Sequence, residues 1–115
     1  MTIVQRAIIF SGAIVIFGQV SAASAGPQWH ACQPVDVAAY KTRVHVQCSS
    51  TAAGGIKYFA VKSSETFAKN FLAVANSALV AGKSLQILFY SNRYGTNFGC
   101  GRSNCRPADG IIILR

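Results

Sequence analysis

The side chains that could take part in acid–base chemistry are few and far apart in the sequence. The carboxylates are Asp36, Glu65 and Asp109, and the imidazoles are His30 and His45. General acid–base and nucleophilic catalysis need such groups within hydrogen-bond reach of one another. Neither histidine has an acid or a nucleophile beside it, and a helix start and a turn account for Glu65 and Asp109. The sequence therefore predicts no catalytic residue and no cofactor, and it disfavours a small secreted hydrolase or nuclease.

The cysteines predict two disulfide bonds. Cys32, Cys48, Cys100 and Cys105 form an even set, which in an exported chain is typical of a disulfide framework. Four cysteines allow three pairings. Cys32–Cys48 with Cys100–Cys105 is favoured, because each bond then closes a short loop. Zinc is the weaker interpretation, because Cys100 and Cys105 lack a second closely spaced pair. We therefore expect no metal.

A basic, aromatic stretch near the C-terminus is the best candidate for ligand binding. Two arginines and three aromatic residues are interspersed there, at Tyr90, Arg93, Tyr94, Phe98 and Arg102, which we call the loop set. Guanidinium groups pair with carboxylates, and aromatic faces stack on flat rings. The alternative is that Tyr94 and Phe98 simply cover the fold. The formal net charge of +8 favours an anionic partner such as a sialylated glycan, a lipid head group or a nucleic acid, although a solvated basic surface would have the same charge.

The first 25 residues have the three parts of an export signal. Arg6 precedes an apolar run over 7–18, and the small-residue site Ala23-Ser24-Ala25 follows. The run is shorter than the roughly 20 residues that a membrane-spanning helix needs. Cleavage after Ala25 would leave one disulfide-stapled domain, 26–115, of 115 − 25 = 90 residues. We expect a secreted or periplasmic protein with no stable membrane span after cleavage.

One helix is predicted after the polar start at Ser63. Apolar residues recur at helical spacing from Phe67 to Ala78, and Gly82 fits the left-handed residue that ends a helix. Ser63 or Ser64 is the expected N-cap, with Glu65 in the first turn.

The remaining segments predict five strands. Two of them, around Lys41 and Thr42, read as a hairpin in which His45 is exposed. Trp29, in the lead-in before the first strand, is expected in the core. The expected strands cover 34–40, 43–48, 56–61, 84–90 and 111–114.

The predicted element order is β-β-β-α-β-β, which is that of an OB-like five-stranded barrel. The alternative is an α+β sandwich with one helix on an antiparallel sheet. Both are mostly β with a single α-helix, and the order of elements does not separate them.

Two segments, the run from Phe71 to Phe89 and the Cys-bracketed turn Gly99 to Arg106, resemble the B subunits of subtilase-cytotoxin-like and typhoid-toxin-like bacterial toxins. The chain also resembles related small secreted proteobacterial proteins of unknown function, which have a Val-His-Val-x-Cys segment as at 44–48. The resemblance implies an OB fold, a homo-pentamer and glycan binding. The acidic and serine residues that hold the sugar in that family have no counterpart here, so no sugar-binding residue is carried over.

The sequence as a whole favours a secreted, non-catalytic binding module, toxin-B-subunit-like and with a surface glycan as ligand. The alternative is an exported binder of single-stranded nucleic acid or another anionic ligand, since OB folds track single strands with basic grooves and aromatic residues. Whether a toxic A subunit accompanies the protein is not encoded in this chain.

Overall fold

The computed structural model describes residues 26–115. The predicted export signal, 1–25, lies outside the described residues. Within the described part, the protein is mostly β with one α-helix, and its six strands form one mixed sheet that is not closed. This agrees with the mostly-β prediction, whereas the closed five-stranded barrel is not confirmed. No helix in this part of the chain is long and apolar enough to cross a membrane.

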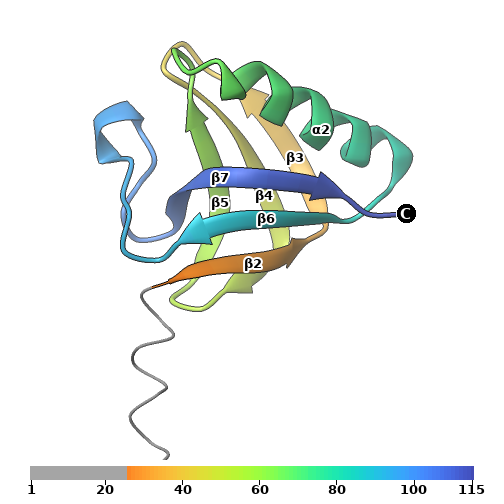
Figure 1. Cartoon of the computed structure of the whole chain (residues 1–115), viewed down its shortest axis with the longest axis horizontal. Coiled ribbons are helices and arrows are strands. Elements are labelled where there is room, and N and C mark those ends of the chain that lie inside the picture. Colours follow the sequence, from red (N-terminus) through yellow and green to blue (C-terminus); the bar gives the residue numbers. More distant parts are fainter. Residues whose placement is uncertain (1–25) are drawn as a thin grey trace, which may run out of the picture.

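The strands follow one another in the order β2-β6-β7-β5-β4-β3 across the sheet. All neighbouring strands are antiparallel except β5 and β7, which are parallel. In Figure 1, β2, β6 and β7 run crosswise to β3, β4 and β5, so the sheet consists of two halves. The bounds are β2 Pro27–Cys32, β3 Pro34–Ala39, β4 Arg43–Ala52, β5 Ile56–Lys62, α2 Phe67–Ala81, β6 Leu85–Tyr90 and β7 Cys105–Ile113.

Two of the sequence predictions about strands are wrong. The lead-in before Cys32 is itself a strand, β2, which pairs with β6 from Pro27↔Tyr90 to Cys32↔Leu85. The last strand begins at Cys105, not at Ile111, and it includes the stretch that was expected to be a turn. Pro107 fits there because β7 pairs with β6 only from Ala108 onward, with a bulge near Asp109, so β6 requires no hydrogen bond from the missing N–H of the proline.

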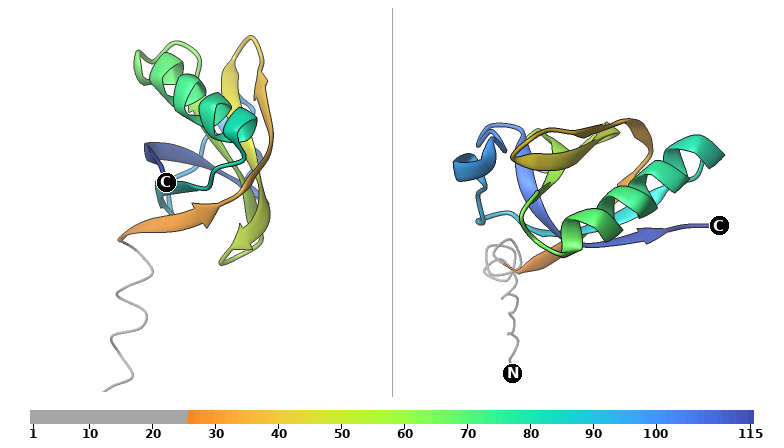
Figure 2. Two further views of the ribbon diagram at one scale, coloured as in Figure 1. Left: turned by 90° about the vertical axis from the view of Figure 1, so that its right-hand side faces the viewer. Right: turned by 90° about the horizontal axis from the view of Figure 1, so that it is seen from above.

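The helix α2 is confirmed, and it lies across one end of the sheet in both views of Figure 2. Its buried residues are Ala68, Phe71, Ala75 and Ala78, which recur at spacings of three and four. Gly82 ends it in the left-handed conformation, with φ 67°, as predicted. The predicted N-cap is wrong, because Thr66 precedes the first helical residue and makes no side-chain capping bond.

The main core lies between α2 and the inner face of the sheet. Its largest fully buried side chains are Phe59, Phe71 and Phe89, and the rings of Phe59 and Phe89 are 5.0 Å apart. Leu85, Ile87 and Phe89 alternate inward along β6, as their period-two spacing predicts. The Cys32–Cys48 and Cys100–Cys105 pairings are both confirmed, and the first lies in this core.

Two residues lie where the sequence did not place them. Trp29 is 50% exposed, on the outer face of β2, because strand alternation directs it away from the core. His45 was expected at the surface but is only 8% exposed. The alternation along β4 is as predicted, with Val44 and Val46 in the core, but other side chains cover the opposite face too.

Candidate binding groove

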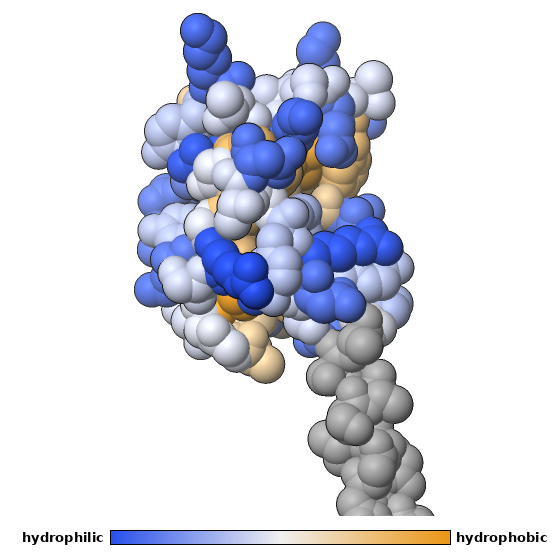
Figure 3. All heavy atoms as spheres, turned by 90° about the vertical axis from the view of Figure 1, so that its left-hand side faces the viewer, coloured by the Kyte–Doolittle hydropathy of each residue, from blue (hydrophilic) through white to orange (hydrophobic). Residues whose placement is uncertain are grey.

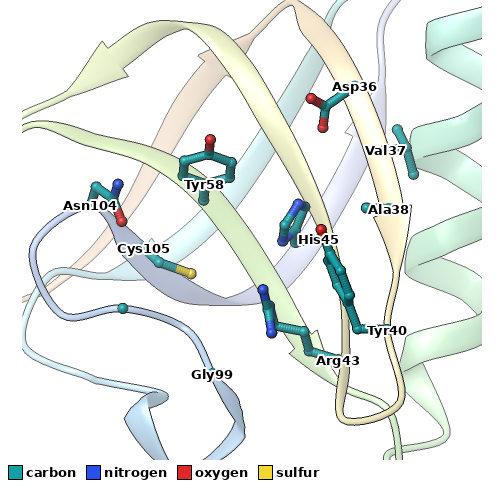
Figure 4. Close-up of a pocket in the computed structure, with 11 residues that line it drawn as sticks. Asp36, Val37, Ala38, Tyr40, Arg43, His45, Tyr58, Gly99, Asn104 and Cys105 are labelled. Carbon is teal, nitrogen blue, oxygen red and sulfur yellow. The ribbon is translucent and has the colours of Figure 1, made fainter.

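A cavity of about 510 Å³ lies on the outer face of β3, β4 and β5. The segment between β6 and β7 forms one of its walls, through Gly99, Gly101, Asn104 and Cys105. We call this cavity the groove. Figure 4 shows His45 between Tyr58 and Tyr40, with Asp36 and Arg43 toward opposite ends.

Strand register explains why these side chains share one face. Across β3, β4 and β5, Asp36 pairs with Gln47 and Gln47 pairs with Tyr58. In the next row that faces outward, His45 has the small residues Ala38 and Ala60 as its neighbours. Residues two apart on a strand share a face. The small Ala38 therefore leaves room beside the imidazole, whereas Ala60 is buried under Phe98, Cys100 and Cys105.

An aromatic row lines this part of the groove. The His45 ring centroid is 5.4 Å from that of Tyr40 and 5.2 Å from that of Tyr58. Tyr40 is 52% exposed, so much of its surface remains open to a ligand. Exposed aromatic faces of this kind stack on sugar rings, bases and other flat groups.

Arg43 adds a positive charge at one end of the row. Its guanidinium carbon lies 4.4 Å above the centre of the Tyr40 ring. A Cβ on Gly99 would lie 2.5 Å from an Arg43 guanidinium nitrogen, and Gly99 has φ +90°, so glycine makes room for the arginine. Within residues 26–115, Arg43 forms no salt bridge, and its charge is not neutralised by a carboxylate in contact.

The wall beside Gly99 is fixed by its own small core. Phe98, Cys100 and Cys105 pack with Ala60 of β5, and Phe98 is only 9% exposed. The hydroxyl of Thr42 donates a 3.2 Å hydrogen bond to the backbone oxygen of Phe98, which ties the wall to the turn between β3 and β4. The groove is therefore bounded on this side by packed structure.

His45 is neutral at neutral pH. Burial lowers its pKa below the ordinary 6.5 because it disfavours the charged imidazolium, and the nearby positive charge of Arg43 lowers it further. The carboxylate of Asp36 opposes these two effects. The row therefore presents neutral rings near pH 7, with one charged group at each end.

The loop set does not line the groove. Tyr90 lies beneath the guanidinium of Arg93, whose carbon is 3.8 Å from the ring centre, and Arg93 also contacts Asp109 at 3.4 Å. Tyr94 lies between two guanidinium groups, those of Arg102 at 4.3 Å and Arg106 at 4.4 Å. The loop set therefore consists of two arginine–tyrosine stacks, Tyr90 with Arg93 and Tyr94 with Arg102, and the buried Phe98.

Figure 3 shows the side of the molecule on which the segment between β6 and β7 lies. Hydrophilic residues surround a few recessed apolar ones there. Arg93, Tyr94 and Phe98 border a smaller hollow of about 330 Å³ on the outer side of β5 and β7. This hollow also has Lys62, Glu65 and Asp109 around it, so both acidic and basic groups line it.

Tyr40, Arg43, His45 and Tyr58 are site residues that the sequence does not predict. A signal was present, because the period-two pattern puts Arg43, His45 and Gln47 on one face of β4. The sequence predicts that this face is exposed, since nothing in it shows which residues of β3 and β5 lie beside the face. Only the register brings Tyr58 next to Gln47 and within reach of His45.

The described residues include no cluster of three or more His, Cys, Asp or Glu side chains that could hold a metal ion. Comparison with protein-family models, with curated proteins and with solved structures found no match for this chain.

Proposed function

We propose that the protein is an exported, non-catalytic binding module and that the groove holds a sugar ring of a glycan. The observation that carries this is the aromatic row of Tyr40, His45 and Tyr58 along a cavity of about 510 Å³. The apolar C–H face of a pyranose stacks on such rings, while polar groups at the rim bind its hydroxyls. Asp36, Arg43 and Asn104 supply acceptors and donors at that rim.

The side chains of the groove are better suited to ligand binding than to catalysis. Within the described residues, His45 makes ring contacts but has no hydrogen-bonded carboxylate or hydroxyl partner, so no activated nucleophile is assembled. Asp36 is the one carboxylate on the lining and stands without a second acid. Hydrolysis of glycosides commonly needs a pair of carboxyl groups.

The connection between β2 and β3 supports an OB-like barrel for this module. The two strands form the opposite edges of the sheet, yet only Gln33 separates them in sequence. We propose that they are two halves of one bent strand, so that the order becomes β-β-β-α-β-β around an incompletely closed barrel. The groove then lies on the face of the second and third strands, which OB folds commonly use for oligosaccharides and oligonucleotides.

A single-stranded nucleic acid is the second candidate ligand. Its support is the net charge of +8 and the unneutralised Arg43 beside an aromatic row. Asp36 on the lining of the groove disfavours it, because a carboxylate there repels a phosphodiester chain. We therefore place the glycan first.

The resemblance to toxin B subunits leads us to propose also that the protein forms an oligomer. It implies a homo-pentamer that binds a surface glycan, and the two disulfides fit the oxidising compartment to which such proteins are exported. The mass of the protein in solution, measured by light scattering, tests this part. A monomer at all concentrations would remove the pentamer but leave the groove proposal in place.

The test of the groove compares two exposed tyrosines. A glycan array, followed by NMR titration of the strongest ligand, should show binding that Tyr40→Ala weakens by about tenfold, the effect of losing one stacked ring. Tyr94→Ala is the matched control and should bind like the parent protein, because Tyr94 lies outside the groove. If Tyr94→Ala loses binding and Tyr40→Ala keeps it, the loop set is the site instead. Oligothymidylate, titrated in parallel, tests the second candidate.

A further inference from the structure

His45 is the one polar side chain of the groove that is more than nine-tenths buried. It lies on β4 beneath the opening, with Tyr40 on one side and Tyr58 on the other (Figure 4). Among the other polar side chains of the lining, Asp36 and Asn104 are exposed at the rim, whereas Arg43 and Tyr58 are partly buried. A ligand that fills the groove therefore meets the imidazole at its floor.

Neither ring nitrogen of His45 has a hydrogen-bond partner among residues 26–115. His30 is different, because its Nε2 lies 3.2 Å from the backbone oxygen of Ser50. A buried polar group without a partner is costly, so native proteins almost always satisfy such groups. The imidazole at the floor of the groove is thus ready to bond to a group that enters from outside the chain.

A hydroxyl is the group that best completes this bond. A neutral imidazole has one donor and one acceptor nitrogen, and a hydroxyl can pair with either because it both donates and accepts. A carboxylate or a phosphate only accepts, and it would favour the charged imidazolium. The surroundings hold His45 neutral, so they suit the hydroxyl and not the anion.

We propose that the groove is specific for neutral, hydroxyl-rich rings and that His45, at the floor of the groove, forms a hydrogen bond with one hydroxyl of the ligand. This inference rests on the proposed glycan-binding function, and it adds the class of ligand and the residue that selects it. It also assigns Arg43 a role at the rim in place of a role as the main anchor for an acidic sugar.

A pH dependence of binding follows from this arrangement. The groups that face His45 are Asp36 and Tyr40 from β3 and the turn after it, Arg43 on β4 itself, and Tyr58 on β5. The wall contributes Gly99, Gly101, Asn104 and the disulfide-bonded Cys105, which do not titrate. A neutral ring over His45 would strip the remaining solvent from it and lower its pKa further. Affinity must therefore fall as the pH drops and His45 takes up a proton.

The experiment titrates the protein with N-acetyllactosamine, a neutral probe, and with 3′-sialyllactose, an acidic one, and follows amide and His ring signals by NMR. The neutral sugar should shift the signals of the groove, and its affinity should decrease when the pH is lowered from about 7.5 to about 5. His45→Gln keeps a donor and an acceptor but cannot titrate, so it should bind without this pH dependence. His45→Leu should bind about tenfold more weakly at both pH values.

The control is His30→Leu, which removes the other histidine, outside the groove, and should bind like the parent protein. If His45→Leu binds like the parent, if binding tightens in acid, or if the acidic sugar alone binds, the inference is wrong and the proposed function stands. If neither sugar shifts any signal of the groove, the proposed function fails and the inference fails with it. Should His45→Leu not fold, the pH profiles of the parent and of His45→Gln still decide the outcome.

Discussion

At the scale of single residues, Arg43 shows how much of the groove depends on a glycine. Its guanidinium occupies the space where a side chain on Gly99 would stand, and it stacks on Tyr40 from there. The arginine comes from the start of β4, whereas the glycine comes from the segment before β7. Their contact therefore fixes one end of the aromatic row.

Gly99→Ala should destabilise the protein by about 1–2 kcal/mol, because alanine tolerates φ +90° poorly and its Cβ would press on Arg43. Gly55→Ala is the matched control, since Gly55 has φ +82° but nothing within 4 Å of an added Cβ. Urea unfolding should show the larger loss for Gly99→Ala. In an Arg43→Ala background the two substitutions should cost the same, and a persisting difference would contradict the steric explanation.

His45 should also make stability depend on pH. Its pKa is lowered in the folded protein by burial first and by Arg43 second, so the unfolded chain binds more protons. Stability from this residue is fully present above about pH 6.5, the unfolded value, and is lost as the pH falls from there toward the folded pKa.

Urea unfolding between about pH 7.5 and about pH 5 should show this loss, and His45→Gln should reduce its slope. Tyr40→Phe keeps His45 and should retain the slope of the parent protein. An unchanged slope in His45→Gln would mean that other groups cause the pH dependence.

At the scale of elements, the two disulfides join different parts of the structure. Cys32–Cys48 connects the end of β2 to the middle of β4 in the main core, with a sequence separation of 16. Cys100–Cys105 closes a turn with a separation of 5 and holds the wall of the groove. Arg106 assists this wall, because its guanidinium donates hydrogen bonds to the backbone oxygens of Ser91, Arg102 and Cys105.

Replacing each disulfide by alanines should therefore have different effects. Cys32→Ala with Cys48→Ala should cost about 3 kcal/mol of unfolding free energy, and Cys100→Ala with Cys105→Ala about 2 kcal/mol, because the shorter loop loses less entropy when it is closed. The second pair should nevertheless impair ligand binding more, since it releases the groove wall. Chemical denaturation and the glycan titration measure the two quantities separately. Equal losses of binding would argue against a role of the wall.

At the scale of the whole molecule, the net charge and the proposed export bear on the kind of partner that the proposed binding module would meet. Removal of Arg6 with residues 1–25 would change the formal charge from +8 to +7, and the remaining basic residues are spread along the chain. A spread-out charge of this kind raises the rate at which anionic partners arrive, but it does not select among them. In this proposal, the groove determines which ligand is bound.

Expression of the whole chain in a bacterium should give a protein that begins at Gly26 and is found in the periplasm or the medium. N-terminal sequencing and mass spectrometry of the purified protein check the cleavage site. An Ala23→Arg, Ala25→Arg variant should remain uncleaved, because the small-residue site is lost. A mature protein that retains Arg6 would contradict the export proposal.

The sequence by itself determined the local structure. Residues 67–81 form a helix that Gly82 ends, and β6 points Leu85, Ile87 and Phe89 inward, because apolar spacing and glycine conformation act over a few residues. The disulfide pairing also followed from short separations along the chain. These features need no knowledge of distant contacts.

The tertiary structure alone decided where the candidate site lies. β2 and the early start of β7 escaped prediction because their pairing partners, β6 and β5, are remote in the sequence. Tyr40, His45 and Tyr58 come together only when β3, β4 and β5 take their register, and Gly99 reaches Arg43 only when the wall packs on β5. Side-chain type and spacing encode which face a residue occupies, but long-range pairing decides what lies beside it.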